Sequence, residues 1–260
     1  MPTGLSALLP DLSISAAIPV MAIVFLAGIL RGFTGFGFAL AAVPTITLFV
    51  PPAKVVPAIL IVALVAGAEI LPKAWRQAHW PSIRRLLAGA VFGTPVGVYA
   101  LFTLPANLMR AIIGIIVFVA VLLLWRGIKF SKRPPTVAQL GIGAFSGLLN
   151  GGTAMGGPPV ILYFLASPEV SSIGGVAIGR ASLLVYFFFL SIWTIGMGAI
   201  GGLVDLRTLM FAVLMMPFMA IGNRIGDRLF DKSSARTYQR VALIFLFAIS
   251  LLAIGRAVAG

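Results

Sequence analysis

Long apolar stretches, separated by short polar segments, run along most of this chain. Many are long enough to cross a bilayer as a helix, which takes about 20 residues. They are continuous rather than alternating, and this favours helices over the strands of a membrane barrel. The pattern therefore predicts an all-α polytopic membrane protein. Its predicted membrane elements are 14–31, 36–50, 54–72, 83–103 and 107–127 in the first half, and 137–149, 154–167, 172–201, 205–224 and 237–258 in the second.

Two glycine-rich segments with a common layout interrupt these apolar stretches. The first runs from Arg31 to Pro44 and the second from Ser146 to Pro159. The glycines that match at an offset of 115 positions are Gly28 and Gly143, Gly32 and Gly147, and Gly37 and Gly152. A helix broken at the same place in two halves of a membrane protein is typical of a transporter binding site.

Composition agrees with a membrane protein and narrows its chemistry. The chain is 60% hydrophobic and only 10% charged, with a mean hydropathy of +1.12. A soluble domain of this length could not bury so much apolar surface. The sequence has no cysteine and a single histidine, which excludes disulfides, thiolate metal sites and multi-histidine metal sites. We therefore predict no cofactor and no metal.

The net charge of +13 comes from 19 Lys and Arg against six acids. These basic residues lie in small clusters and no soluble basic domain is present, so we predict no nucleic-acid partner. Short cytoplasmic loops of membrane proteins collect Lys and Arg. The segments 73–85, 126–133 and 224–240 are accordingly predicted to face the cytoplasm.

Matching loops of the two halves carry opposite charge bias. In the first half the 73–85 loop is basic and the 103–107 loop is uncharged, whereas in the second half 201–207 is nearly neutral and 224–240 is basic. This exchange predicts two inverted repeats, each a re-entrant broken-helix pair followed by three transmembrane helices, with both termini away from the cytoplasm. Asp205, in the neutral loop, is predicted to cap the next helix. The predicted domains are 1–133 and 134–260.

The two glycine segments are candidate binding sites for a small anion. A helix broken inside a bundle exposes backbone N–H groups, and the next half-helix begins with the positive end of its dipole. Two such ends near the midplane would suit an oxyanion. The alternative is that the glycines only allow close helix packing. The candidate substrate-binding residues are Thr34, Gly35, Phe36 and Gly37 at the first break, and Asn150, Gly151, Gly152, Thr153, Gly156 and Gly157 at the second.

Three charged residues lie within or beside predicted spans. Arg31 and Arg180 would offer a fork of donors to sulfonate or sulfite oxygens if buried. Their alternative role is to extend to the membrane interface. Glu69 is the only acid inside a predicted span and is a candidate proton carrier. An ion pair with Lys73, four residues later, is the alternative role for Glu69.

These motifs resemble those of a known transporter family. The first is Gly32-Phe-Thr-Gly-Phe-Gly-Phe-Ala39 followed by Pro44, and the second is Asn150-Gly-Gly-Thr-Ala-Met-Gly-Gly-Pro-Pro159. Together they are similar to the paired signatures of the sulfite exporter TauE/SafE family, also called TSUP, the 4-toluene sulfonate uptake permease family. The resemblance covers nearly the whole chain.

The resemblance implies a multi-pass permease of the bacterial inner membrane and not an enzyme. It implies secondary transport, by alternating access, of sulfite or organosulfonates such as sulfoacetate, taurine-derived sulfonates or toluenesulfonate. The expected partners are this small anion and the lipid bilayer. A coupling ion, H+ or Na+, and a homodimer remain open. No Walker motif is present, so ATP-driven transport would need another chain.

Two other classes of function remain as alternatives. An anion channel is one, because broken helices also line pores. An intramembrane enzyme is the other, but the sequence lacks a set of paired acids, metal ligands or a nucleophile with a histidine.

Overall fold

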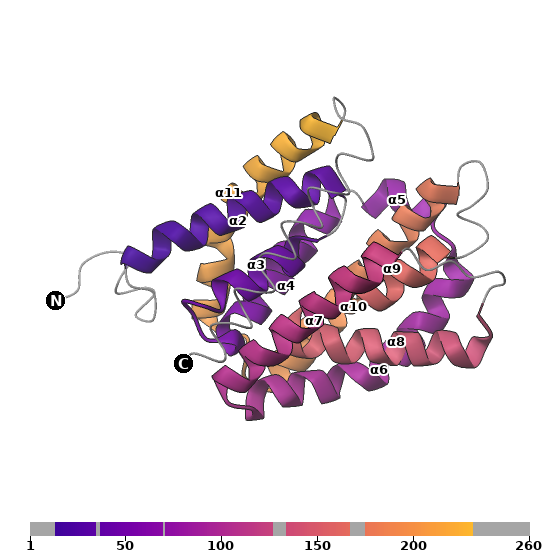
Figure 1. The fold of residues 1–260 in the computed structure, drawn as a ribbon, viewed down its shortest axis with the longest axis horizontal. Coiled ribbons are helices and arrows are strands. Elements are labelled where there is room, and N and C mark those ends of the chain that lie inside the picture. Colours follow the sequence, from indigo (N-terminus) through magenta and orange to yellow (C-terminus); the bar gives the residue numbers. More distant parts are fainter. Residues whose placement is uncertain (1–13, 35–36, 70, 127–133, 167–174, 231–260) are drawn as a thin grey trace. The chain divides into compact units, whose positions relative to one another are not determined.

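A computed structural model describes residues 14–34, 37–69, 71–126, 134–166 and 175–230 of the chain. All regular secondary structure in these ranges is α-helical, as predicted (Figure 1). The helices are α2 (Ile14–Thr34), α3 (Phe38–Ile46), α4 (Pro52–Ala68), α5 (Leu71–Gln77), α6 (Trp80–Thr103), α7 (Ala106–Arg126), α8 (Thr136–Thr153), α9 (Gly157–Ala166), α10 (Gly175–Ile200) and α11 (Leu206–Phe230).

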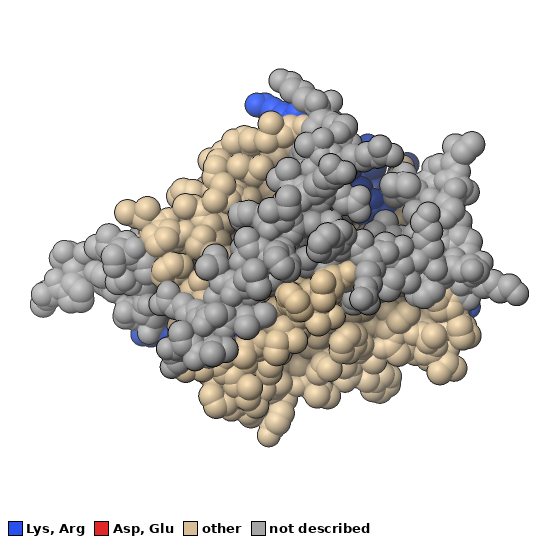
Figure 2. Space-filling model, viewed as in Figure 1, with Lys and Arg blue, Asp and Glu red and all other residues tan. Residues whose placement is uncertain are grey.

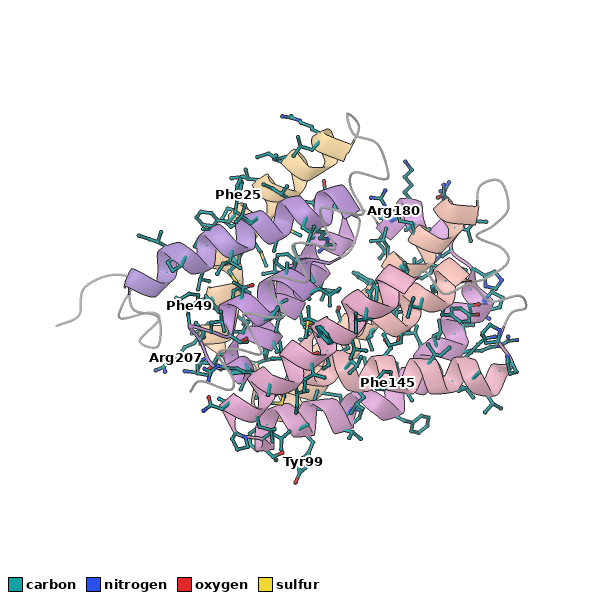
Figure 3. All side chains as sticks on the ribbon, viewed as in Figure 1. Phe25, Phe49, Tyr99, Phe145, Arg180 and Arg207 are labelled. Carbon is teal, nitrogen blue, oxygen red and sulfur yellow. The ribbon has the colours of Figure 1, made fainter. Side chains whose placement is uncertain are left out.

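Three of the described helices are individually long and apolar enough to span a membrane. The spans lie within α6, α10 and α11, at Trp80–Thr103, Ile178–Ile200 and Leu206–Gly226. A fourth span is available if α4 and α5 are counted together. Large apolar side chains on the outside of these helices agree with contact with lipid, as Tyr99 and Phe145 do where they point away from α6 and α8 (Figure 3). The face in Figure 2 is accordingly almost free of charged atoms among the described residues.

The predicted boundaries agree with the structure to within a few residues, except at the end of α11, which continues to Phe230 instead of residue 224, and at one further place. The stretch 54–72 was predicted as one element and 73–85 as a loop. Instead α4 ends at Ala68 and α5 begins at Leu71 after a bend of 72°. Most of the predicted loop is helical, and Trp75 of α5 meets Trp80 edge to face, with ring centroids 4.5 Å apart. The predicted element 237–258 lies outside the described residues.

The chain forms two compact units that do not follow the order of the sequence. Unit 1 combines Met1–Val62, Leu104–Val121 and Gly202–Gly260, and unit 2 combines Ala63–Thr103 and Leu122–Gly201. Each unit contains one glycine break. Each also contains helices from both halves of the chain, so the two proposed sequence repeats are interleaved in the folded protein.

In unit 2, helices α6 and α8 pack along their length through glycine. A Cβ atom added to Gly143 would lie 2.0 Å from the Leu86 carbonyl oxygen. One added to Gly147 would lie 2.5 Å from the carbonyl oxygen of Ala90. Both residue numbers rise by four from one contact to the next, so the two helices run parallel. Backbone approach this close leaves no room for a side chain between them.

In unit 1, helices α2 and α11 form the corresponding contact. A Cβ atom on Gly28 would lie 2.8 Å from the Met219 carbonyl oxygen, and one on Gly222 would lie 2.2 Å from that of Phe25. The matching pairs in unit 2 are Gly143 with Leu86 and Gly89 with Leu140. The contacts of unit 1 become those of unit 2 when 115 is added to the residue numbers of α2 and 133 is subtracted from those of α11. The alternative reading of these glycines, close packing, is therefore confirmed for Gly28 and Gly143.

Asp205 caps α11 as the sequence predicts. Its Oδ1 accepts hydrogen bonds from the Thr208 N–H and from the Thr208 hydroxyl, both at 2.7 Å. These bonds, above all the one from the backbone N–H, hold the pKa of the Asp205 carboxyl below its ordinary value. The charge of the carboxylate also suits the positive end of the helix dipole.

We expect Asp205→Ala to lower the free energy of unfolding by about 1 kcal/mol at neutral pH, the usual effect of losing a cap. A depressed carboxyl pKa stabilises the fold above the unfolded-state value, near 4, and that contribution is lost as the pH falls through the folded-state pKa. Thermal melts in detergent at about pH 7 and about pH 3 should therefore show a larger difference from wild type at the higher pH. Asp205→Asn should keep most of the cap, and an equal deficit for the alanine variant at both pH values would contradict this account.

Candidate functional site

The second glycine break is a tight turn between α8 and α9. Helix α8 ends at Thr153, and the next residue, Ala154, has left-handed angles of φ 57° and ψ 12°. Among the described non-glycine residues only Ala154 has a positive φ. Its N–H still donates to the Asn150 carbonyl oxygen at 2.8 Å. Because such angles are unfavourable for alanine, the surrounding contacts must hold this turn in place.

After the turn the chain folds back along α8. A Cβ atom on Gly156 would lie 2.8 Å from Asn150 Cβ and 2.6 Å from the Ser146 carbonyl oxygen. Further on, the Tyr163 hydroxyl lies 2.7 Å from Ser82 Oγ, near the start of α6. Since α6 and α8 run parallel, α9 runs back toward the beginning of α8. The broken-helix pair predicted for the second half is therefore present as a helical hairpin.

The position of this turn along α6, in the same unit, follows from a contact between Gly152 and Gly97. A Cβ atom on Gly152 would lie 3.3 Å from the Gly97 carbonyl oxygen. At 1.5 Å per residue, Gly97 is about 26 Å from the start of α6 and about 9 Å from its end. The turn thus lies well beyond the middle of α6, so the predicted midplane position does not coincide with the centre of this helix.

Four buried polar side chains, here called the turn cluster, hold the hairpin against α10: Ser146, Asn150, Tyr186 and Thr194. The Ser146 hydroxyl donates to the Gly156 carbonyl oxygen at 2.6 Å and accepts from the Tyr186 hydroxyl at 2.9 Å. Asn150 Nδ2 donates to Thr194 Oγ1 at 2.8 Å. All four residues are buried. Buried polar groups with these bonds stabilise one arrangement of the turn.

At the second break, several of the candidate substrate-binding residues make contacts within the protein that build the turn. Thr153 Oγ1 donates to the Leu149 carbonyl oxygen at 2.6 Å and accepts from the Met155 N–H at 3.3 Å. A Cβ atom on Gly151 would meet the Thr94 carbonyl oxygen at 2.4 Å, so this glycine packs on α6. The donors left for a ligand are backbone amides.

The two breaks differ in how many amides they present. Helix α9 begins with Gly157, and its next two residues, Pro158 and Pro159, have no N–H. Helix α3 begins after Gly37, a residue with φ 92°, and its first intrahelical bond runs from Ala41 N to the Gly37 carbonyl oxygen. The first three amides of α3 therefore have no acceptor within the helix, which makes this end the richer in donors.

Comparison with known proteins identifies the family to which this chain belongs. The family described as Sulfite exporter TauE/SafE matches residues 20–253 of the chain. This chain belongs to the TauE/SafE family. A Cupriavidus necator protein, named probable sulfite/organosulfonate exporter TauE, is 27% identical over 228 residues, covering 83% of this chain and 85% of that protein. No solved structure matches the chain.

Family membership and the apolar helices together establish the class of the protein. It is a multi-pass membrane transporter of the TauE/SafE family and not an enzyme. A bacterial source is consistent with the relative. Among the described residues there is no group of three or more His, Cys, Asp or Glu side chains that could hold a metal ion.

Of the four candidate substrate-binding residues at the first break of this TauE/SafE protein, the structure describes two. Thr34 is the last residue of α2 and Gly37 precedes α3, while 35–36 lie outside the described residues. Arg31 lies in the last turn of α2 and is 9% exposed. At the offset of 115 its counterpart is Ser146, which holds the turn at the second break. The buried arginine thus occupies the position of a turn-cluster residue.

Arg180 is not brought to the second break. Its side chain is exposed near the beginning of α10 (Figure 3). Thr194, which contacts Asn150, lies 14 residues further along the same helix, a rise of about 21 Å. This position agrees with the alternative, interfacial reading of Arg180.

Glu69 lies in the turn between α4 and α5 and is exposed. The ion pair with Lys73 that the spacing suggested does not form between these two described residues, because the 72° bend interrupts the helix that would align them.

Sequence reasoning missed Tyr186 and Thr194 of the turn cluster. Both lie on α10, eight residues apart with Leu190 between them, and this spacing puts polar groups on one helix face. Their spacing within an apolar helix was the signal that could have found them.

Proposed function

We propose that this chain is a secondary transporter that moves small sulfur oxyanions, sulfite or organosulfonates, across the bacterial inner membrane by alternating access. The observation that carries the proposal is the α8–α9 hairpin, a broken helix built by a duplicated glycine motif in a TauE/SafE protein. The name of the Cupriavidus necator relative supports this substrate class. The sequence contains no motif for ATP, which favours secondary transport.

The anion would be bound by backbone amides at the starts of the half-helices. Candidate donors are the amides in the first turn of α3 within unit 1 and, separately, the Gly156 and Gly157 amides at the second break within unit 2. Arg31 adds charge, since it is the one buried charged side chain among the described residues. A guanidinium donates two parallel bonds to a sulfonate or sulfite, so it would favour these anions over a single-point donor.

Alternating access would follow from motion of the two inverted repeats, 1–133 and 134–260, around the bound anion. The matching contacts of two helix pairs support a duplication, because α2 packs on α11 through glycine as α8 packs on α6. Two related halves could each adopt the conformation of the other. This change would open the site first to one side of the membrane and then to the other.

Flux into proteoliposomes tests the substrate and the mechanism. Purified protein should transport radiolabelled sulfite, or an organosulfonate such as sulfoacetate, in a saturable manner and in exchange for unlabelled anion inside. Acetate is the matched carboxylate control and should neither be transported nor compete. High unitary conductance in planar bilayers, without countertransport, would instead identify an anion channel.

We expect Arg31→Ala to lower the transport rate at subsaturating anion by about 10- to 100-fold, since a charge-assisted bidentate contact contributes about 1.5 to 3 kcal/mol. Arg180→Ala is the matched control and should change it by less than about twofold, because this arginine is exposed and about 21 Å from the second break. The measurement is initial uptake with equal amounts of reconstituted protein. Similar rates for both variants and wild type would remove arginine from the site.

A further inference from the structure

The only histidine of the chain, His79, caps the first turn of α6 through its ring. Its Nδ1 accepts a hydrogen bond from the Ser82 N–H at 3.3 Å, and its carbonyl oxygen accepts from the Ile83 N–H at 3.3 Å. Between them, the Trp80 N–H donates to the Ala78 carbonyl oxygen and Pro81 has no N–H. Each amide of this helix start is thereby accounted for, and that of Ser82 depends on the imidazole.

His79 also connects α6 with two other helices of unit 2. Its Nδ1 lies 3.0 Å from Ser82 Oγ, and Ser82 Oγ lies 2.7 Å from the hydroxyl of Tyr163 on α9. The backbone N–H of His79 donates to Ser182 Oγ of α10 at 2.8 Å. Ser82, Tyr163 and Ser182 are buried, whereas His79 is half-buried at the end of the bundle. A partly exposed titratable ring is thus joined by hydrogen bonds to α9, the helix that follows the turn between α8 and α9.

Nδ1 can act as the acceptor of this cap only while it carries no proton. Protonation would leave the Ser82 N–H without its acceptor and place a positive charge at the positive end of the α6 dipole. The titratable or charged side chains on the described elements around His79 are Lys73 and Arg76 of α5, Arg84 and Arg85 of α6, Tyr163 of α9 and Arg180 of α10. Histidine ordinarily changes charge between about pH 5 and pH 8, and protonation of Nδ1 in this range would remove the cap.

We propose that Nδ1 of His79 is a proton-binding site that controls the docking of α9 on α6. When the ring is neutral, the capped first turn of α6 holds Ser82 Oγ in place for Tyr163. When the ring binds a proton, this turn loosens and α9 is released from α6. Tyr163 lies six residues after the start of α9, a rise of about 9 Å, so the signal reaches the hairpin that begins at the turn cluster. Its effect on transport rests on the proposed function; the proton site itself does not.

Hydrogen–deuterium exchange of Gly157–Ala166 in lipid nanodiscs tests the release of α9. After correction for intrinsic rates, wild-type protection should fall about tenfold from about pH 8 to about pH 5.5, the factor expected from the loss of one hydrogen bond. His79→Asn supplies an acceptor in the position of Nδ1 that does not titrate in this range, so its protection should stay high at both pH values. His79→Ala should be poorly protected at both.

Two outcomes would overturn the proton site. One is a wild-type decrease in protection that persists unchanged in His79→Asn. The other comes from nitrogen NMR of the single histidine, in protein purified without a histidine tag. We expect the tautomer with the proton on Nε2 at about pH 8, and observation of the Nδ1–H tautomer would contradict the cap.

Flux measurements separate this proposal from the proposed function. In proteoliposomes, the wild-type rate should change at least threefold between these pH values, and that of His79→Asn should change by less than about twofold. Absence of sulfite and sulfonate flux at every pH, with the expected exchange results, would refute the proposed function and leave the proton site intact. Saturable flux together with α9 protection that is independent of pH would refute the proton site and leave the proposed function intact.

Discussion

Replacement of Gly93 by alanine should prevent the accumulation of folded protein. A Cβ atom on Gly93 would lie 1.8 Å from the Ala144 carbonyl oxygen and 2.7 Å from the carbonyl carbon. These atoms belong to the backbone of α8, so no rotation of a side chain can relieve the overlap. The helices would have to separate along the contact that builds unit 2. We expect a loss of more than about 3 kcal/mol, the upper end of ordinary overpacking.

Gly141→Ala is the matched control for this prediction. Gly141 lies on the neighbouring helix α8, and a Cβ atom there would have no atom within 4 Å. Because alanine also has the higher helix propensity, this variant should be as stable as wild type or slightly more so. Expression level, size-exclusion profile in detergent and thermal melting provide the measurement. A Gly93→Ala protein that elutes and melts like wild type would show that α6 and α8 do not pack this closely.

Ser146→Ala should abolish most transport and leave the protein folded. The substitution removes the donor to the Gly156 carbonyl oxygen and the acceptor of the Tyr186 hydroxyl. Both partners are buried, so the lost bonds would leave them unsatisfied in the turn that holds Ala154 in its left-handed conformation. If this turn binds the anion as proposed, its misplacement by about 1 Å would lower the rate by about 100-fold. We therefore expect transport at subsaturating anion to fall by about 10- to 100-fold.

Thr103→Ala is the matched control for the loss of a hydroxyl. Thr103 is exposed at the end of α6, and its hydroxyl donates to the Tyr99 carbonyl oxygen of its own helix. Anion flux through the Thr103→Ala variant should stay within about twofold of wild type, as for ordinary surface substitutions. Uptake is compared at equal protein incorporation, and melting temperature reports the fold. Normal flux in Ser146→Ala would show that the turn cluster is dispensable for transport.

The helices were largely predictable because spanning a bilayer requires length and apolar character, which the sequence displays directly. The predicted element 83–103 became α6 at Trp80–Thr103, and 107–127 became α7 at Ala106–Arg126. The exception is α5, whose short polar sequence has little signal of its own. In the structure Trp75 meets Trp80 edge to face, and the ring centroid of Trp75 lies 5.8 Å from that of Phe189 of α10, a contact between distant positions.

The sequence located the turn of the second break but not the contacts that its side chains make. The motif located the turn after Asn150 and Thr153, yet their side chains are used to hold it. The partner of Asn150 is Thr194, 44 positions later, and no local pattern could reveal this pairing. Arg180 was a candidate because it lies in a predicted apolar element, but it is exposed and its helix places it about 21 Å along the axis from Thr194.

The sequence by itself determined the membrane class, the family and the positions of the glycine breaks, because apolar length and a duplicated motif are properties of the chain alone. Only the tertiary structure decided which surfaces those glycines meet. Each motif helix packs on a helix from the other half, α2 on α11 and α8 on α6. A glycine in a sequence signals that another backbone can approach, but which backbone approaches depends on carbonyl groups that the folded chain brings together from remote positions.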